Sequence, residues 1–289
     1  MASVLRDFIS SKERQGSSPR TIENYRLSLA PFQTFMGDVT LKAVTTQTLS
    51  AYLDESAKRK PLRADWTGNT ARRRRYDVLR TFLNYCVWMG YFELSPLKDK
   101  PPREPTRIIV PFTPEEVQKM VASCGRNAYR DKAIIMVLCD SGIRLNELSQ
   151  MRRADIDWQE GSAHIHGKGA KQRRVPLSPT TLRYVDRYAK GDSLWLSEEG
   201  HPLTRSGCQQ IIRRISKTAL GRTYGPHKFR HTAACAYLMS GMSVSDLATM
   251  LGHASQRMAL QYAEYVRERH AIQEAKRFSY VEKYLKGGT

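Results

Sequence analysis

The chain has 289 residues, of which 40% are hydrophobic and 26% are charged; this composition is typical of soluble globular proteins, and the length favours two domains. Lys and Arg outnumber Asp and Glu by 47 to 28, and the resulting net charge of +19 indicates a polyanionic partner such as nucleic acid. No apolar run is long enough to span a membrane and the N-terminus lacks a signal-peptide pattern, so we expect a cytoplasmic protein with no membrane partner.

Residues 1–98 are predicted to form a helical domain. Apolar residues recur at helical spacing in four stretches that begin near Val4, Pro19, Thr45 and Asn69. The fourth stretch opens with a dense basic cluster, for which contact with DNA phosphates and a solvated helix face are equally good explanations: Arg72, Arg73, Arg74 and Arg75. The proline-rich, charged residues 99–111 that follow predict an extended interdomain linker.

Residues 112–289 are predicted to form a second domain that is also mainly helical. Thr113-Pro-Glu-Glu has the pattern of a capped helix start, and the apolar residues 133–138 indicate a core helix. Residues 163–165 and 173–177 alternate in hydrophobicity on either side of a glycine-rich stretch, which predicts a β-hairpin with Lys168 at its turn. Further helices are expected at about 179–189, 204–219, 228–240, 244–251 and 256–278. The fold class is therefore mainly α with a small β-hairpin or sheet.

The residue types in the second domain suit chemistry on a phosphodiester. His227 and Arg230 are three residues apart, so on a helix they lie on one face. Together with Arg144, Arg230 could offer paired donors to the non-bridging oxygens of a phosphate and stabilise the charge that develops there. Lys168 could protonate a leaving oxygen. The motif segments contain no carboxylate cluster of the kind that holds Mg²⁺, so neither a metal nor another cofactor is predicted.

Five motifs in order give the chain a specific resemblance. They are Ser141-Gly-Ile-Arg-Leu-Asn-Glu-Leu148, Gly167-Lys-Gly-Ala-Lys-Gln-Arg-Arg-Val-Pro-Leu177, His227-Lys-Phe-Arg-His-Thr232, Leu251-Gly-His253 and Tyr262. This series resembles the tyrosine recombinases, or phage integrase family, and is most similar to Xer-like and mobile-element members. The resemblance covers the whole chain, because the first domain carries a signature similar to the family's core-binding domain, Ser18-Pro-Arg-Thr-Ile-Glu-Asn-Tyr25.

The resemblance implies a two-domain, C-shaped clamp around DNA and a role for each motif residue. Tyr262 would attack the scissile phosphate and form a 3′-phosphotyrosyl link, which conserves the bond energy without ATP or metal. The other five catalytic positions would be Arg144, Lys168, His227, Arg230 and His253, with Glu147 and His231 in support. Four protomers, with or without a second recombinase, would exchange strands at a double-stranded recombination site through a Holliday junction, in a bacterial or archaeal nucleoid.

Several alternatives remain open at this point. Tyr265 is a second candidate nucleophile, and His164 with His166 could form a metal pair, although no third ligand lies nearby. Lys171, Arg173, Arg174, Arg213 and Arg214 are candidates for further DNA contacts, with solvated surface charges as the alternative. A DNA-binding regulator that does not cleave and a tyrosine-type topoisomerase would share much of this pattern. The apolar stripe of residues 266–285 could dock on a neighbouring protomer or pack in cis.

Overall fold

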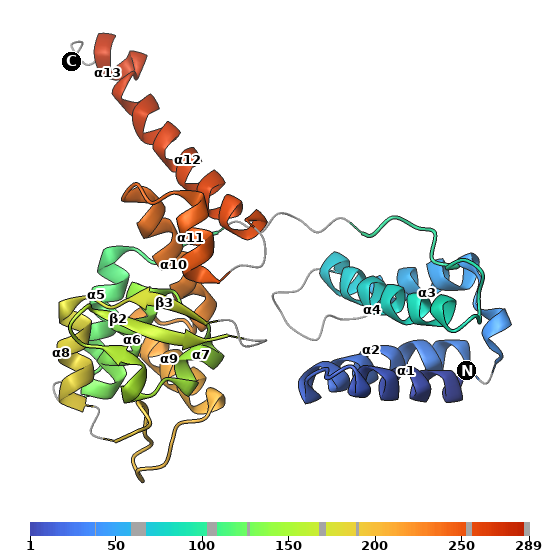
Figure 1. Cartoon of the computed structure of the whole chain (residues 1–289). Coiled ribbons are helices and arrows are strands. Elements are labelled where there is room, and N and C mark those ends of the chain that lie inside the picture. The colour runs from blue at the N-terminus through green and yellow to red at the C-terminus, as the bar shows by residue number, and fades with distance from the viewer. Residues whose placement is uncertain are drawn as a thin grey trace. The chain divides into compact units, whose positions relative to one another are not determined.

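The computed structural model divides the chain into two compact units, Met1–Arg107 and Ile108–Thr289 (Figure 1). The structure describes residues 1–37, 39–58, 68–102, 109–125, 128–167, 172–188, 191–252 and 256–285. Most described residues are helical, and the described strands form one three-stranded sheet in the second unit. The predicted fold class is thereby confirmed. In the described part of the chain, no helix is both long and apolar enough to cross a membrane.

The first unit is built from helices α1 (Ala2–Arg14), α2 (Pro19–Met36), η1 (Leu41–Ala43), α3 (Thr46–Lys58) and α4 (Gly68–Trp88). Helix α2 starts as the sequence indicates: Ser18 Oγ accepts a hydrogen bond from the Thr21 amide and Pro19 occupies the first turn. The core is centred on Phe8, whose ring meets Phe82 edge-on at a centroid distance of 5.5 Å. Aromatic contacts of this kind join α1 to α4.

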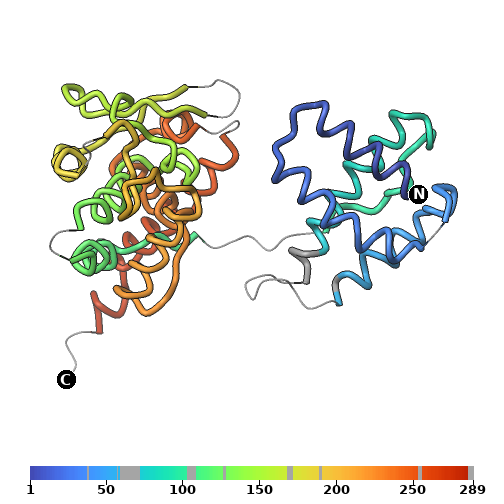
Figure 2. The backbone as a smooth tube through the Cα atoms, turned by 90° about the horizontal axis from the view of Figure 1, so that it is seen from below, coloured from blue at the N-terminus to red at the C-terminus, as the bar shows by residue number. Residues whose placement is uncertain are grey.

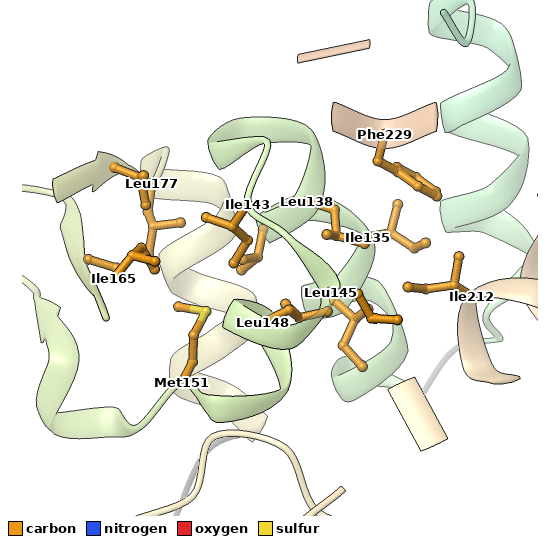
Figure 3. Close-up of a cluster of buried hydrophobic side chains, with 14 of the residues drawn as sticks. Ile135, Leu138, Ile143, Leu145, Leu148, Met151, Ile165, Leu177, Ile212 and Phe229 are labelled. Atoms are coloured by element: carbon orange, nitrogen blue, oxygen red, sulfur yellow. The ribbon is translucent and has the colours of Figure 1, made fainter. Parts of the chain in front are cut away.

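The second unit begins with three helices, of which the second is central to its core: α5 (Pro114–Ser123), α6 (Tyr129–Ser141) and α7 (Leu145–Gln150). A capping box starts α5, because Thr113 Oγ1 accepts from the Glu116 amide and the Glu116 carboxylate accepts from the Thr113 amide. Helix α6 is buried on nearly every side, and the surrounding cluster draws on α7, β2, α9 and α10 (Figure 3). This core supports the helices that carry the predicted site.

The sheet of the second unit has the order β1 (Ile156–Asp157), β2 (Ser162–His166) and β3 (Gln172–Pro176), with antiparallel pairing, and a 3-10 turn, η2 (Arg153–Asp155), precedes it. The backbone trace shows it at the edge of this unit (Figure 2). The hairpin of β2 and β3 was predicted, whereas the two-residue β1 was not. Because strand side chains alternate between faces, Arg173 shares the inward face with buried Val175, and Arg174 points to the opposite face.

The remaining helices are α8 (Pro179–Tyr188), α9 (Arg205–Leu220), α10 (Pro226–Met239), α11 (Val244–Leu251), α12 (Arg257–Arg277) and α13 (Tyr280–Tyr284). Helix α10 packs against α6, α11 and α12. Helix α12 extends away from the body of its unit and ends at Phe278, after which Ser279 caps α13 (Figure 1). The five cysteines are free thiols, and Cys86, Cys208 and Cys235 are buried as small apolar side chains.

Candidate active site

Three consecutive carbonyl groups at the end of α11 hold three arginines. Arg173 Nε donates to Met250 O at 2.8 Å, Arg230 Nη2 donates to Leu251 O at 2.7 Å, and Arg144 Nη2 donates to Gly252 O at 3.2 Å. The last carbonyls of a helix lack intrahelical partners and carry the negative end of the helix dipole, so they suit guanidinium donors. The C-terminus of α11 therefore gathers the predicted phosphate-binding arginines in one place.

Glu147 links two of these arginines from the first turn of α7. Its carboxylate accepts from Arg144 Nη1 at 3.0 Å and from Arg173 Nη1 and Nη2 at 2.9 and 2.7 Å. Burial disfavours ionisation of Glu147, but the hydrogen bonds from Arg173 and Arg144 outweigh burial and lower its pKa. The carboxylate is thus charged at neutral pH and orients Arg144, whose side chain remains 42% exposed.

Two glycines permit this close approach of helices. Gly142 ends α6 in the left-handed conformation, with φ of 58°, and its carbonyl accepts from Arg230 Nη1 at 2.7 Å. A Cβ atom at Gly142 would lie 2.9 Å from Leu251 Cδ2. Gly252 ends α11 with φ of 63°, and a Cβ atom there would lie 3.1 Å from Arg173 Cδ and Nη1. Both positions require glycine for conformation and for space.

Tyr262 lies inside the second unit, in the same chain as the arginines. It is 2% exposed, and its hydroxyl lies 3.1 Å from His231 Nδ1 on α10. Burial raises the pKa of Tyr262, while the positive charge of Arg230 opposes the rise. The phenol is therefore neutral at physiological pH. By contrast, Tyr265, the alternative nucleophile, has its hydroxyl bonded to Arg269 further along α12, at 3.2 Å.

The site carries excess positive charge. Burial and the nearby Arg144 lower the pKa of Arg230 to about 10, so the guanidinium stays protonated at neutral pH. His227 is exposed at the start of α10, yet partial burial of its ring and the charges of Arg230, Arg144 and Arg205 lower its pKa. Arg205, the first residue of α9, adds positive charge near His227, and no sequence motif identified it as a site residue. An anion is the ligand that this cluster favours.

Three predicted site residues, Lys168, Lys171 and His253, lie outside the described residues. Of the six remaining catalytic and supporting residues, four form two direct pairs: Arg144 with Glu147, and Tyr262 with His231. Arg230 joins them through Gly142 and Leu251. His227 occupies the exposed first turn of the same helix as Arg230.

The structure corrects the interpretation of Arg173 as a DNA contact. Its side chain is 11% exposed, and all three of its guanidinium nitrogens donate to Glu147 or Met250. Arg174 instead pairs with Asp157 and Glu160 on the outer face of the sheet. Arg214 pairs with buried Asp131, and Arg213 is exposed on α9.

The basic cluster of α4 is partly structural. Arg72 Nη2 pairs with Asp54 Oδ1 at 2.7 Å, and Arg75 Nη1 donates to Ser56 O at 2.6 Å, so both tie α4 to α3. Arg73 pairs with Asp77 and donates to Pro102 O at 3.3 Å. These three side chains thus make contacts within the first unit, and Arg74 is the exposed one of the four. Contact of this cluster with DNA phosphates stays a prediction.

The two histidines of the alternative metal pair lie on β2. His164 and His166 are both exposed on β2, and His166 Nε2 lies 3.1 Å from Asp155 Oδ1. Among the residues that the structure describes, no group of three or more His, Cys, Asp or Glu side chains could hold a metal ion. The Asp155 contact explains the orientation of His166 without a metal.

A buried tyrosine beside arginines held at a helix end defines a class of site suited to nucleophilic attack on a phosphodiester. Residues 111–269 match the model of the phage integrase family, and residues 6–90 match that of the phage integrase N-terminal SAM-like domain. The chain belongs to the phage integrase family. The predicted resemblance is thereby confirmed.

The chain shares moderate sequence identity with known recombinases. The chain is 26% identical over 274 residues to the tyrosine recombinase XerC of Chlamydia muridarum, covering 84% of this chain and 87% of the relative. It is similar in fold to the XerH site-specific recombinase in a post-cleavage complex with a palindromic difH substrate, with a TM-score of 0.74 and 20% identity over 92% of this chain and 81% of the other. A lambda integrase tetramer bound to a Holliday junction gives a TM-score of 0.71 at 17% identity, covering 88% and 77%.

Proposed function

We propose that this protein is a site-specific DNA recombinase that cuts and rejoins duplex DNA through a covalent link to Tyr262. The observation that carries the proposal is the burial of Tyr262 beside Arg230 within one chain, with its hydroxyl on His231. Because the nucleophile and the phosphate-binding arginines share one unit, we infer that each protomer cleaves in cis. Membership of the phage integrase family supports the same activity.

In the proposed reaction, the Tyr262 hydroxyl attacks the scissile phosphorus in line. A bond forms between the tyrosine oxygen and phosphorus as the bond from phosphorus to the 5′ oxygen breaks, leaving a 3′-phosphotyrosyl link. Arg144 and Arg230 bind the non-bridging oxygens, where negative charge accumulates in the transition state. Their guanidinium groups supply positive charge at the phosphate, and the new ester conserves the energy needed for rejoining.

Proton transfers complete each step. We assign Lys168 to protonate the departing 5′ oxygen, His253 to donate a hydrogen bond to the phosphate, and His227 to assist transfer of the proton that Tyr262 loses as its oxygen bonds to phosphorus. The lowered pKa of His227 keeps its imidazole neutral before DNA binds, and the negative charge of a bound phosphate would raise that pKa toward neutrality, where an acid and base is most effective. Rejoining runs these transfers in reverse.

We further propose that four protomers act on two double-stranded sites through a Holliday junction, as in the lambda integrase tetramer, and that the reaction takes place in the cytoplasm where the chromosome lies. The tail supports an assembly of this kind. Ile272, Phe278, Val281 and Leu285 are between 51% and 78% exposed along α12 and after it. An apolar stripe this exposed fits a surface that becomes buried on a neighbouring protomer.

The test begins with sequencing DNA junctions that become linked to Tyr262 when the protein acts on genomic DNA. A nicked suicide duplex carrying the mapped site then reports one cleavage event. The wild type should form a covalent adduct, and Tyr262→Phe should bind the duplex equally well without forming one. Tyr265→Phe is the matched control and should cleave. An adduct that persists in Tyr262→Phe refutes the assignment, binding without any adduct in the wild type favours the regulator, and site-independent relaxation of supercoiled DNA favours the topoisomerase.

A further inference from the structure

The hydroxyl of Tyr262 contacts a histidine to which the motif comparison assigns no catalytic part. His231 Nδ1 lies 3.1 Å from the Tyr262 hydroxyl, and the two rings have a centroid distance of 5.5 Å and an interplanar angle of 52°. The contact spans the packed helices α10 and α12. His227, the histidine expected to serve Tyr262, is exposed one turn earlier on α10.

The direction of the His231 side chain is fixed by its neighbour. Arg230 is 3% exposed and donates to Gly142 O and Leu251 O, each at 2.7 Å, so the rotation of α10 about its axis is set by two other segments. The next residue points about 100° further round the helix. This rotation carries the half-buried His231 toward α12 and the Tyr262 hydroxyl.

The surroundings keep both partners neutral. Burial, followed by the charges of His227 and Arg230, lowers the pKa of His231 to about 4. Burial raises the pKa of Tyr262 above its ordinary value of 10.0, against the effect of Arg230, with Cys235 and Arg144 also facing the phenol. An imidazole with a pKa this low is too weak a base to hold the proton of such a phenol. The contact is therefore suited to orienting the hydroxyl.

We propose that His231 is a positioning residue whose Nδ1 atom directs the Tyr262 hydroxyl for attack on the phosphate. This rests on the proposed role of Tyr262 as nucleophile. Tyr262 is 2% exposed and its ring is held by packing, and its hydroxyl also interacts with Arg230. The O–H bond can still turn about the C–O bond, and the contact at Nδ1 of His231 fixes its direction. A displacement of about 1 Å at a reacting atom can reduce a rate on the order of 100-fold. Loss of the contact should thus reduce cleavage and leave DNA binding unchanged.

The test separates the two ring nitrogens of His231. In His231→Asn the amide occupies the position of Nδ1, in His231→Gln it lies nearer Nε2, and His231→Leu retains bulk without a hydrogen bond. On the suicide duplex, we expect His231→Asn to cleave within about fivefold of the wild type, and the Gln and Leu variants to cleave on the order of 100-fold more slowly. Duplex affinity and melting temperature identify any variant that is misfolded.

Two results would overturn the proposal. One is cleavage by His231→Leu at the wild-type rate. The other is an equal loss in the Asn and Gln variants, which would indicate packing and not a contact at Nδ1. If the Leu variant does not fold, the Asn and Gln pair still decides between these explanations.

A measurement without DNA separates this proposal from the assignment of the nucleophile. The ¹⁵N resonance of His231 Nδ1, identified by its loss in His231→Asn, should shift in Tyr262→Phe, which removes only the hydroxyl. An unchanged resonance would show that the contact does not form and would overturn the positioning role. If the resonance shifts but the wild type forms no adduct, the contact between His231 and Tyr262 exists and the proposed function is wrong instead.

Discussion

The ion pair between Arg173 and Glu147 should contribute a large share of the stability of the second unit. The two side chains are only 11% and 6% exposed, and two hydrogen bonds of 2.9 and 2.7 Å join them. Removing one partner of a buried pair costs about 3–5 kcal/mol, because the other charge stays buried. In Arg173→Met, Glu147 retains Arg144, so we expect the lower end, about 3 kcal/mol.

Thermal unfolding measures this cost. For a unit spanning residues 108–289, a loss of about 3 kcal/mol should lower the melting temperature by about 6–12 °C. The matched control is Arg174→Met, one residue away on the other face of β3. Its ion pairs with Asp157 and Glu160 are made by a side chain that is 44% exposed, so the loss should be under about 1 kcal/mol.

Comparing these two variants tests whether the Arg173–Glu147 pair stabilises the second unit more than a surface ion pair does. Equal melting temperatures for Arg173→Met and the wild type, or equal losses in Arg173→Met and Arg174→Met, would show that the Glu147 pair contributes no more than a surface pair. Arg173→Lys refines the result, because it keeps the charge but loses the paired geometry and the bond to Met250 O.

Three further outcomes are expected. DNA affinity should fall on the order of 10³-fold or more between 50 and 200 mM salt, as it does when several phosphates are neutralised, and a flat response in a filter-binding titration would exclude a clamp of this charge. Deleting the chain beyond Glu268 should preserve binding to one site but reduce pairing of two sites in native gels, and unchanged recombination would refute docking in trans. His231 has a pKa of about 4 in the folded protein, against an ordinary value of 6.5. Between these pH values the unfolded chain binds more protons than the folded protein. The free energy of unfolding should therefore fall by about 3 kcal/mol from pH 7 to pH 4. In urea titrations His231→Asn should lack this part of the fall, and an identical pH profile would contradict the low pKa.

The sequence predicts local structure well because caps and periodicity are local signals. The capping box at Thr113 and Glu116 and the antiparallel pairing of β2 with β3 were predicted from a few adjacent residues. Strand β1 has only two residues, too few to show alternation, and so it was missed. Helix α12 (Arg257–Arg277) was predicted at 256–278, within one residue at each end, although the apolar stripe continues into α13.

The site was predictable in its residue types but not in its contacts. The direction of Arg173 had a usable signal: it shares strand parity with buried Val175 and Leu177, which places it on the inward face. No sequence signal predicts the hydrogen bonds from Arg144, Arg173 and Arg230 to main-chain carbonyls, because every residue has a carbonyl group. The contact of His231 with Tyr262 depends on how α10 packs against α12, which no local pattern specifies.

The charges around the end of α11 explain why this site favours a phosphate. Arg144, Arg173 and Arg230 contribute three positive charges and Glu147 one negative charge, which leaves an excess of two. The negative end of the α11 dipole offsets roughly half a charge of this excess. The lowered pKa of Arg230, caused by burial and then by Arg144, shows that mutual repulsion persists. A phosphodiester brings one negative charge and relieves part of that repulsion, and the transition state places still more negative charge on the same oxygens. The remaining positive charge is therefore neutralised most completely in the transition state, which is the condition for catalysis by differential binding.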